Sequence, residues 1–288
     1  MPTTITEAFV NQFNANIHVL AQQKASRLEA TVDVESGIVG ESKAVERIGS
    51  TDATQRVTRN ADTKLLDVEH SKRWIDLSDY DWATLLDQPD KIKMLIDPTS
   101  QYSVAALAAM NRAKDSVIIS ALGGSARSTK AGTGSVALPS GQKIAHGGAG
   151  LTLAKLTQAK QLLDEAEVDE DEPRFCVITA EQLNNLLNVT EVKSADYNSV
   201  KALVKGEIDT YLGFKFIRSE RLPKASTTRY CYAYAKTGVQ LGIGQDVKAR
   251  ISERADKNYA VQVYAAMSLG AVRVEEARVV EIACTEAA

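Results

Sequence analysis

The spacing of apolar positions predicts one long helix near the middle of the chain, at residues 97–122. Asp97 can cap its first turn, and Pro98 suits the first helical position, where a missing N–H costs nothing. Gly123 and Gly124 supply the backbone freedom at which helices end. Apolar residues recur at steps of three or four, which predicts one face that is buried along the full length. These residues are Val104, Leu107, Met110, Ala113, Val117 and Ala121, flanked by Ile118 and Leu122. With a length of about 37 Å, the helix is expected to bridge two packing centres.

Three further patterns precede this helix. Residues 4–27 carry apolar side chains at helical spacing and predict an amphipathic helix without a core of its own. The apolar residues are Ile5, Phe9, Phe13, Ile17 and Leu20. Residues 28–75 show brief alternation within dense charge, which predicts a polar hairpin. Such a ribbon is marginal in water, so we expect either support from a neighbouring copy or a flexible, solvated loop. Residues 74–95 alternate at first and are then expected to be helical around Trp82 to Leu86.

The second half of the chain alternates between strand-like and helical segments. Residues 123–150 are rich in Gly, Ser and Thr and predict a mobile loop or hairpin. An amphipathic helix is expected at 151–168, followed by an acidic connector. A short apolar strand at 174–179 and a helix at 180–187 then indicate a small mixed α/β unit.

Composition and charge exclude several classes of protein. The 288 residues are 44% hydrophobic and 25% charged, which is ordinary for a chain with a packed core. The formal net charge of -3 gives no electrostatic reason for tight binding to nucleic acid. No apolar run is long enough for a membrane span, and no basic leader begins the chain, so we expect it to stay in the cytosol. Cys176, Cys231 and Cys284 are widely spaced and are expected to be small buried residues.

The sequence contains no complete motif for metal binding, phosphate binding or catalysis. Asp76, Asp79 and Asp81 lack the spacing of a calcium loop, so turn and capping roles are expected. Lys130 lies near glycines but outside any phosphate-loop motif. Residues 146–150 (HGGAG) resemble an esterase oxyanion loop, but the chain has no GxSxG nucleophile motif. We therefore predict no catalytic residue, no cofactor and no metal.

Residues 200–223 carry the first resemblance to a known family. A short helix, a turn and a strand before Leu-Pro resemble the axial-domain signature of tailed-bacteriophage major capsid proteins. The matching residues are Gly206, Ile208, Gly213, Phe214, Phe216, Ile217, Leu222 and Pro223. Gly206, Gly213 and Pro223 are expected to be structural turn residues. Residues 71–124 resemble the same family's passage from extended loop to spine helix. Residues 248–284 resemble its peripheral sheet, with a turn expected at Leu269 and Gly270 and with Gly270, Ala271 and Arg273 as its G-A-x-R element.

The resemblance implies an α+β chain with the tailed-phage capsid fold, also called the Johnson fold. The expected parts are an N-terminal arm (1–27), an extended β-hairpin loop (28–75), a peripheral domain (76–150) with the spine helix (97–122), an axial domain (151–247) and a return to the peripheral sheet (248–288). The mixed charges of the loop suit polar contacts between subunits, which fix register more than they add affinity. The candidate contact residues are Glu35, Lys43, Glu46, Arg47, Arg56, Arg59, Lys72 and Arg73.

The resemblance also implies a function in a virion. Such proteins self-assemble as pentamers and hexamers into an icosahedral shell around phage double-stranded DNA, and they are assembled in the host cytoplasm. The alternative is an encapsulin-like shell that encloses cargo, although the long loop favours a virus. Expected partners are further copies of the chain and a portal protein, with a separate scaffolding or decoration protein left open. Packaged DNA is expected nearby but not specifically bound, and no membrane is expected. Because the chain starts almost at its arm, we expect a separate scaffolding protein or none. We make no prediction of covalent cross-linking, because nothing in the sequence brings Lys43, Lys64 and Asn60 together.

Overall fold

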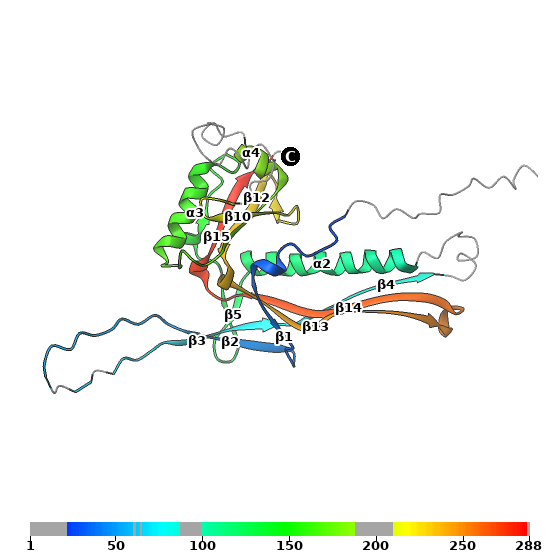
Figure 1. Cartoon of the computed structure of the whole chain (residues 1–288), viewed down its shortest axis with the longest axis horizontal. Coiled ribbons are helices and arrows are strands. Elements are labelled where there is room, and N and C mark those ends of the chain that lie inside the picture. Colours follow the sequence, from blue (N-terminus) through cyan, green and yellow to red (C-terminus); the bar gives the residue numbers. More distant parts are fainter. Residues whose placement is uncertain (1–21, 60–61, 64, 87–98, 188–209, 287–288) are drawn as a thin grey trace, which may run out of the picture. The chain divides into compact units, whose positions relative to one another are not determined.

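The computed structural model describes residues 22–59, 62–63, 65–86, 99–187 and 210–286. It divides into two compact units. The first unit comprises Met1–Ser26, Asp79–Ala113 and Asp246–Met267, and the second comprises Arg27–Ser78, Lys114–Gln245 and Ser268–Ala288. The long helix α2 (Thr99–Gly123) and the strands β13 (Val239–Arg254) and β14 (Ala260–Arg273) have residues in both units (Figure 1).

A seven-stranded sheet forms the largest part of the second unit. Its strands lie in the order β7 (Lys143–Ile144), β15 (Val279–Thr285), β12 (Thr228–Ala235), β8 (Arg174–Ile178), β10 (Phe214–Arg218) and β9 (Thr210–Tyr211), and β11 (Lys224–Ala225) pairs with β12. All residues of β8 are buried, as expected for an apolar central strand that is covered on both faces. β8 pairs in parallel with β10 and antiparallel with β12.

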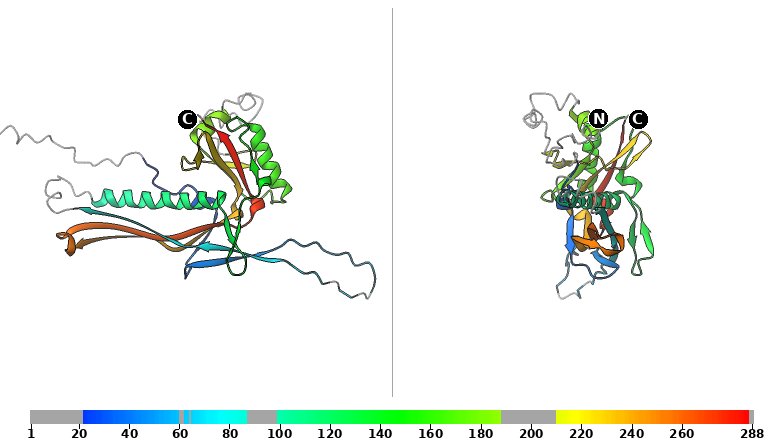
Figure 2. Two further views of the ribbon diagram at one scale, coloured as in Figure 1. Left: turned by 180° about the vertical axis from the view of Figure 1, so that it is seen from behind. Right: turned by 90° about the vertical axis from the view of Figure 1, so that its right-hand side faces the viewer.

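Two helices accompany this sheet, α3 (Leu153–Glu165) and α4 (Ala180–Leu187) (Figure 2). Thr152 caps α3, since its side-chain oxygen accepts a hydrogen bond from the backbone N–H of Lys155. α3 packs against β15 through a buried face that includes Leu156 and Leu163. The predicted helices at 151–168 and 180–187 and the strand between them are thereby confirmed.

A second sheet of the same unit has four antiparallel strands. They lie in the order β2 (Ser42–Ile48), β3 (His70–Asp76), β5 (Ala126–Ser128) and β6 (Gly134–Val136). β2 and β3 form the expected hairpin, with Ser42 opposite Asp76 and Ile48 opposite His70. Its inner end packs on a small core of Ile75, Ala126 and Val272. β5 and β6 form a hairpin in the glycine-rich segment after α2, which is one of the two structures expected there.

The third sheet contains β1 (Asp33–Ser36), β13, β14 and β4 (Ser78–Leu86) in that order. Within the first unit, Leu86 of β4 and Val261 and Val263 of β14 form a buried cluster, against which Trp82 and Tyr102 pack. Tyr102 belongs to α2, so the N-terminal half of the helix covers these strands. The remaining elements are short 3-10 helices: η2 (Glu29–Thr31), η3 (Ser140–Gln142), η4 (Lys236–Gly238), η5 (Ala255–Lys257) and η6 (Glu276–Arg278).

Several expectations for local structure were wrong. The segment around Trp82 to Leu86 is strand and not helix, because its side chains alternate between exposed and buried positions in β4. Residues 22–27 are not helical, although the predicted amphipathic helix ran to Arg27, and residues 1–21 lie outside the described part. The expected turn at Leu269 and Gly270 is also absent, because β14 runs straight through both residues.

Gly270 is required for a close approach of backbone and not for a turn. A Cβ atom at this position would lie 2.0 Å from the backbone carbonyl oxygen of Asp76. That distance is well inside van der Waals contact, so only glycine fits where β14 passes the end of β3. The sequence therefore pointed to the right residue, but a glycine can be required either by a turn or by the close approach of another backbone segment.

The helix α2 ends at Gly123 as predicted, while the expected cap at Asp97 and Pro98 lies outside the described residues. The predicted buried stripe is only partly correct. Met110, Ile118 and Leu122 are buried, but Val104 and Leu107 are 40% and 42% exposed. The N-terminal half instead buries small alanines, which a count of large apolar residues does not identify. These are Ala106 and Ala108.

Two strands have partners other than those expected. β1, predicted as part of the polar hairpin, pairs in parallel with β13, so the hairpin begins only at Ser42. The last strand, β15, was expected to join the sheet of the preceding strands β13 and β14. It pairs with β12 and β7 in the seven-stranded sheet instead.

Candidate assembly interface

The hairpin β2–β3 and its connecting residues form the candidate interface of the second unit (Figure 1). Every described residue from 49 to 69 is exposed except the half-buried Val68. Large apolar side chains are among them: Val57 is 88% exposed and Leu65 is 93% exposed. Ile48, at the end of β2, is 72% exposed. Large apolar side chains that a chain leaves in water on an exposed loop make that loop a candidate site of protein association.

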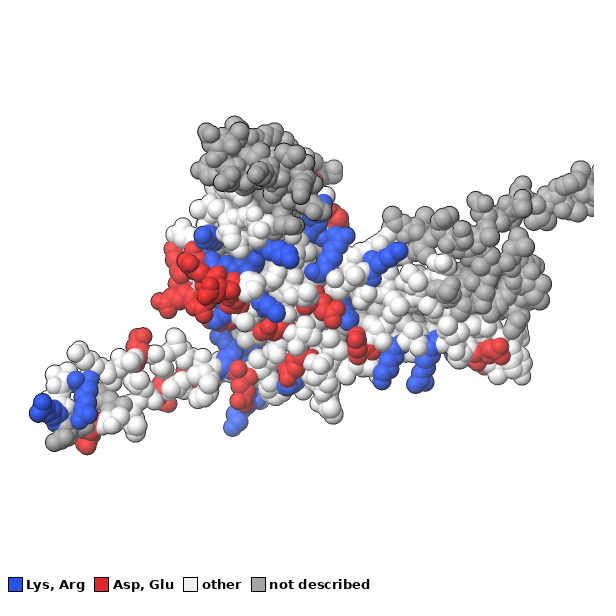
Figure 3. Space-filling model, in the orientation of Figure 1, with Lys and Arg blue, Asp and Glu red and all other residues white. Residues whose placement is uncertain are grey.

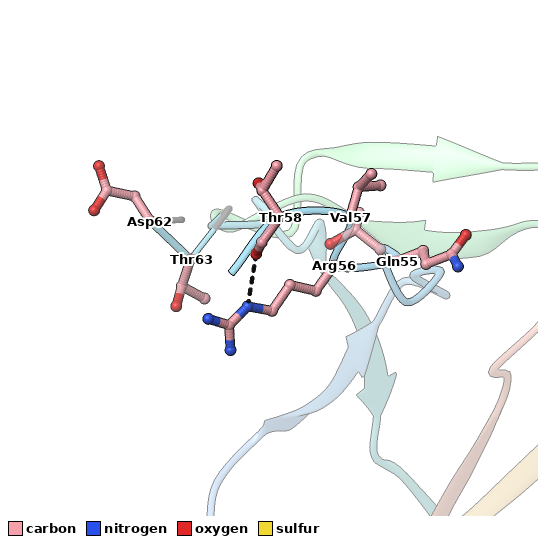
Figure 4. Close-up of a pocket in the computed structure, with 7 residues that line it drawn as sticks. Gln55, Arg56, Val57, Thr58, Asp62 and Thr63 are labelled. Carbon is pink, nitrogen blue, oxygen red and sulfur yellow. Dashed lines mark hydrogen bonds between the residues drawn. The ribbon is translucent and has the colours of Figure 1, made fainter. Parts of the chain in front are cut away.

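The outer end of this loop encloses a hollow lined by residues of its two limbs (Figure 4). Arg56 turns back along the chain, and its Nε atom donates a hydrogen bond to the carbonyl oxygen of Thr58 at 3.2 Å. Val57 contributes the one large apolar side chain of the lining, beside polar residues such as Asp62 and Thr63. A small-molecule site is normally apolar with a few convergent polar groups, so this hollow is better described as the space within a loop.

The predicted contact residues fall into two groups. Arg56 and Arg59 are exposed on the loop. The others form ion pairs within the chain, along the hairpin and at its base. Lys43 pairs with Glu35, Lys72 with Glu46 at 2.8 Å, and Arg47 and Arg73 both with Glu276. Exposed pairs such as Lys72–Glu46 contribute little stability by themselves.

Glu276 connects the hairpin to the rest of the second unit. The Nη2 atom of Arg73, a residue only 7% exposed, donates to both carboxylate oxygens of Glu276 at 2.9 and 3.0 Å. Arg47 of β2 approaches the same carboxylate at 3.4 Å. Because Arg47 lies on β2 and Arg73 lies on β3, the single carboxylate of Glu276 anchors both strands at the base of the hairpin. Glu276 lies far away in the chain and in no recognised motif, so no pattern in the sequence pointed to it.

Arg273 is completely buried and closes the C-terminal end of α2. Its Nη1 atom donates to the carbonyl oxygens of Leu122 at 3.1 Å and Gly124 at 2.6 Å, and Nη2 donates to that of Val136 at 2.9 Å. A cation there satisfies terminal carbonyls and complements the helix dipole. Burial lowers the pKa of Arg273 from its ordinary value, and the Glu276 carboxylate nearby opposes that change. The arginine of the G-A-x-R element is thus structural.

The glycine-rich segment 146–150 is organised around Lys155 of α3. The Nζ atom of this buried lysine donates to the carbonyl oxygens of His146, Ala149 and Gly150 at 2.8 to 2.9 Å, and to that of Ala283 at 2.9 Å. Burial lowers the pKa of Lys155. An oxyanion hole needs convergent N–H donors, whereas here carbonyl oxygens converge on a cation. The geometry therefore argues against esterase chemistry.

The other sequence candidates also have structural roles where they are described. Cys176, Cys231 and Cys284 are free thiols buried in the seven-stranded sheet, and burial raises the pKa of Cys176. Gly213 has φ of +83° in the turn between β9 and β10. The carbonyl oxygen of Pro223 accepts a hydrogen bond from Tyr230 at 3.1 Å. Gly206 lies outside the described residues.

Among the residues that the structure describes, no three His, Cys, Asp or Glu side chains come together as metal ligands. None of the described helices has the length and apolar character needed to cross a bilayer.

Charge is mixed on the face of the molecule shown in Figure 3. Acidic residues gather at the end of α3 and in the turn after it, where the sequence carries the run Asp164, Glu165, Glu167, Asp169, Glu170, Asp171 and Glu172. Lys and Arg side chains are spread among acidic ones over the rest of this face. A nucleic-acid-binding protein normally gathers its basic residues into one patch or stripe.

Fold and surface therefore describe a structural protein: a mixed α/β chain with a long helix, an exposed apolar loop and buried polar groups that hold backbone in place. The chain matches the model of the phage capsid protein family over residues 5–286, nearly its full length, and it belongs to that family. A search of curated protein sequences finds no match.

Solved phage capsids share this fold. The capsid protein of cyanophage P-SCSP1u is 18% identical, with a TM-score of 0.74 over 100% of this chain and 96% of its own. That of Ralstonia phage GP4 is 8% identical, with a TM-score of 0.76 over 97% of this chain and 96% of its own. The acid-stable capsid of Helicobacter pylori bacteriophage KHP30 gives 10% identity and a TM-score of 0.75, over 98% of this chain and 97% of its own.

These findings confirm the expected fold and function. The chain is a structural capsid protein of a bacteriophage, and the matches favour this function over an encapsulin-like cargo shell. Its place is the virion, and it forms capsid oligomers with further copies of itself.

Proposed function

We propose that this capsid protein assembles as pentamers and hexamers into a closed icosahedral shell around phage double-stranded DNA. It does so without catalysis, and assembly takes place in the host cytoplasm. The observation that carries this proposal is the loop between β2 and β3, with Val57 and Leu65 almost fully exposed. Apolar side chains at the end of a long hairpin lose contact with water only when a second copy covers them.

The parts of the chain have distinct roles in this proposal. The extended loop lies over a neighbouring subunit, with Arg56 and Arg59 making polar contacts at its outer end. Arg47, Arg73 and Glu276 act inside the chain and hold the hairpin base at the angle that this contact needs. The arm (1–27), the peripheral domain and the axial domain supply the other contacts, with the axial domain, whose sheet includes β15, toward the capsomer centre.

Charge supports the proposed relation to DNA. A chain with a net charge of -3 and a mixed surface does not grip nucleic acid, so a packaged genome remains free to leave the shell. The proposed partners beyond the chain itself are a portal protein and a separate scaffolding or decoration protein. None of them requires a cofactor or a membrane.

Electron microscopy of the overexpressed full-length chain tests the proposal. We expect closed shells, tubes or capsomer rings. The matched control replaces residues 49–69 with a two-residue Asn-Gly turn, which suits a short hairpin. This variant should fold, as judged by circular dichroism, but form no shells. If the full-length chain stays monomeric at every concentration tested, or if the control assembles equally well, the proposal is wrong.

A further inference from the structure

The strand β13 has a backbone edge in the first unit that no described strand covers. On one side β13 runs along β14, and on the other it pairs with β1 only from Gln240 to Ile243 (Figure 1). Every residue from 248 to 254 is exposed. We call residues 248–252 on the uncovered side the open edge. An uncovered strand edge is a template for pairing with a strand of another chain.

The two faces of the open edge differ in chemistry. Arg254 donates a hydrogen bond to the side-chain oxygen of Gln262 on β14 at 3.1 Å, so the two share a face of the sheet. Val263 lies on the other face, in the buried apolar cluster. Side chains alternate along β13, so the Arg254 face carries Lys248 and Arg250, and the Val263 face carries Ala249 and Ile251. The edge therefore offers basic groups on one face and apolar groups on the other.

Residues 65–69 of the loop carry the complementary pattern. Leu66 and Val68 alternate with Asp67 and Glu69, which places apolar side chains on one face of an extended segment and acidic ones on the other. Leu66 is 51% exposed, and Ile251 of the open edge is 55% exposed. Among the described residues, neither these two acids nor the two basic residues of the open edge form an ion pair. The complementary charges therefore do not meet within one chain, which makes a second copy the partner.

Backbone hydrogen bonds show which residues can pair outward. The carbonyl oxygen of Ile243 accepts a hydrogen bond from Gly37, on the β1 side, at 2.9 Å. The odd-numbered residues of β13 therefore direct their backbone groups to the open edge. In the loop, the carbonyl oxygen of Glu69 accepts from Gly49 of the opposite limb at 2.8 Å. The even-numbered residues of 65–69 therefore direct theirs away from the hairpin.

These directions distinguish antiparallel from parallel pairing. In an antiparallel pair, two residues whose backbone groups point at each other lie directly opposite. In a parallel pair, a residue that points at the partner strand lies opposite one that points away. Parallel pairing would thus put Leu66 and Val68 opposite charged positions of β13. Antiparallel pairing puts them opposite Ala249 and Ile251.

We propose that residues 65–69 of one copy add to the open edge of β13 of a second copy as an antiparallel strand. The register pairs Leu66 with Ile251, Asp67 with Arg250, Val68 with Ala249, and Glu69 with Lys248. A shift by one residue would move the apolar side chains to the charged face. A shift by two would leave one of the basic side chains without an acidic partner. This inference rests on the proposed assembly and specifies the surface and the register that the loop uses.

Disulfide trapping in assembled particles tests the register. The test variant carries Leu66→Cys with Ile251→Cys, and the matched control carries Leu65→Cys with Ile251→Cys. Leu65 is more exposed, at 93%, but it lies one position away and on the other face of the segment. Both are oxidised with copper phenanthroline and air, and the unmodified chain, whose three cysteines are buried, gives the background. We expect covalent oligomers from the test variant and at most background from the control.

Charge exchange provides a measurement without cysteines. Lys248→Glu together with Arg250→Glu places like charges opposite each other, so the yield of shells should fall about tenfold or more. Adding Asp67→Lys and Glu69→Lys to the same chain restores opposite charges and should restore the yield. All four side chains are exposed, so circular dichroism should show that every variant is folded.

Three results would overturn the inference. One is equal trapping, or none, in shells of the test and control variants. Another is a fast-migrating intrachain product from dilute, unassembled test variant, because the segment then pairs with its own β13. The third is a folded charge-exchanged chain whose yield of shells stays low. If any of these occurs while the unmodified chain forms shells, only the pairing of the loop is wrong. If no shells form at all, the proposed function fails and this pairing fails with it.

Discussion

Lys155 shows how one residue can hold a segment that has little side-chain packing of its own. Residues 146–150 contain three glycines, so the segment gains almost nothing from apolar burial. Its carbonyl oxygens are instead satisfied by one buried ammonium group, which also reaches Ala283 of β15. A buried carbonyl without a donor costs free energy comparable to that of a lost hydrogen bond.

We therefore expect Lys155→Met to lower the free energy of unfolding by about 2–4 kcal/mol, because several buried carbonyls lose their common donor. Urea unfolding followed by circular dichroism measures the change. Lys160→Met is the matched control, since Lys160 is an exposed lysine of the same helix, and its effect should stay within about 0.5 kcal/mol. Equal midpoints for the two variants would show that Lys155 does not organise this segment.

The contact of Glu286 with Arg229 should make the stability of the chain depend on pH. Its carboxylate accepts hydrogen bonds from Arg229 at 2.5 and 2.8 Å. The Arg229 guanidinium holds the pKa of Glu286 below its ordinary value of 4.5. The unfolded chain therefore takes up a proton at higher pH than the folded chain does, so this stabilisation is complete above about pH 4.5 and is lost as the pH falls through the folded pKa.

Glu286→Gln should thus lower the free energy of unfolding by about 1–2 kcal/mol at pH 7, and the difference from the unmodified chain should shrink as the pH falls below 4.5. Glu281→Gln provides a control of opposite sign, because burial raises the pKa of Glu281. There, falling pH should favour the unmodified chain over the variant. Urea unfolding from pH 7 to pH 3 measures both slopes, and parallel slopes would contradict the prediction.

At the scale of elements, the hairpin β2–β3 depends on Glu276. Its carboxylate neutralises Arg73, whose side chain is only 8% exposed. Glu276→Gln leaves that guanidinium buried without a counter-charge, so we expect a loss of about 3–5 kcal/mol. Because the contact lies at the hairpin base, hydrogen exchange should accelerate first at the amides of β2 and β3. Exchange of these strands at the unmodified rate would contradict the prediction.

Glu275→Gln is the matched control for this experiment. Glu275 is the preceding residue, and it pairs with Arg278 while its side chain is 40% exposed. Removal of this charge should cost less than about 1 kcal/mol and leave exchange in the hairpin unchanged. The two variants differ by one position and carry the same change of charge, but only Glu276 pairs with a buried arginine and with both strands of the hairpin.

Some of the helices and strands could be predicted from the sequence, and others could not. Segments with one dominant period were predicted correctly, as for α3, α4 and β8, because amphipathic spacing and local burial agree there. The segment at Trp82 to Leu86 was wrong, since a run of five residues fits either period and only pairing in the sheet decides between them. Gly270 was read as a turn because close backbone approach depends on Asp76, nearly two hundred residues earlier.

The candidate interface was predicted less completely than the fold. The sequence identified the polar hairpin, but it did not distinguish charges that pair within the chain from those available to a neighbour. Arg73 and Glu276 are separated by 203 positions, and no local pattern brings them together. The structural roles of Lys155 and Arg273 could not be predicted either. Both donate to backbone carbonyl oxygens, and because every residue has one, the sequence does not show which carbonyls are the partners.

At the scale of the whole molecule, the described chain separates internal stability from association. The buried clusters and polar anchors lie around the sheets and α2, whereas the described residues of the loop 49–69 add no buried apolar residue to them. A protein that worked as a monomer would gain nothing from such a loop. In a capsid protein, the same loop can be changed without unfolding the chain, so assembly and stability should respond to different substitutions.

Leu65→Asp tests that separation. Leu65 is 93% exposed, so the variant should unfold within about 0.5 kcal/mol of the unmodified chain. Its shell formation should nevertheless be abolished, because a charge would be buried without a partner where the loop meets a neighbouring copy. Thr63→Asp is the matched control: it adds the same charge to the same exposed loop but removes no large apolar side chain. Sedimentation and electron microscopy count the shells, and urea unfolding confirms that both variants are folded. If Leu65→Asp assembles as well as Thr63→Asp, the apolar loop is not the contact that closes the shell, and the interface must be sought elsewhere on the chain.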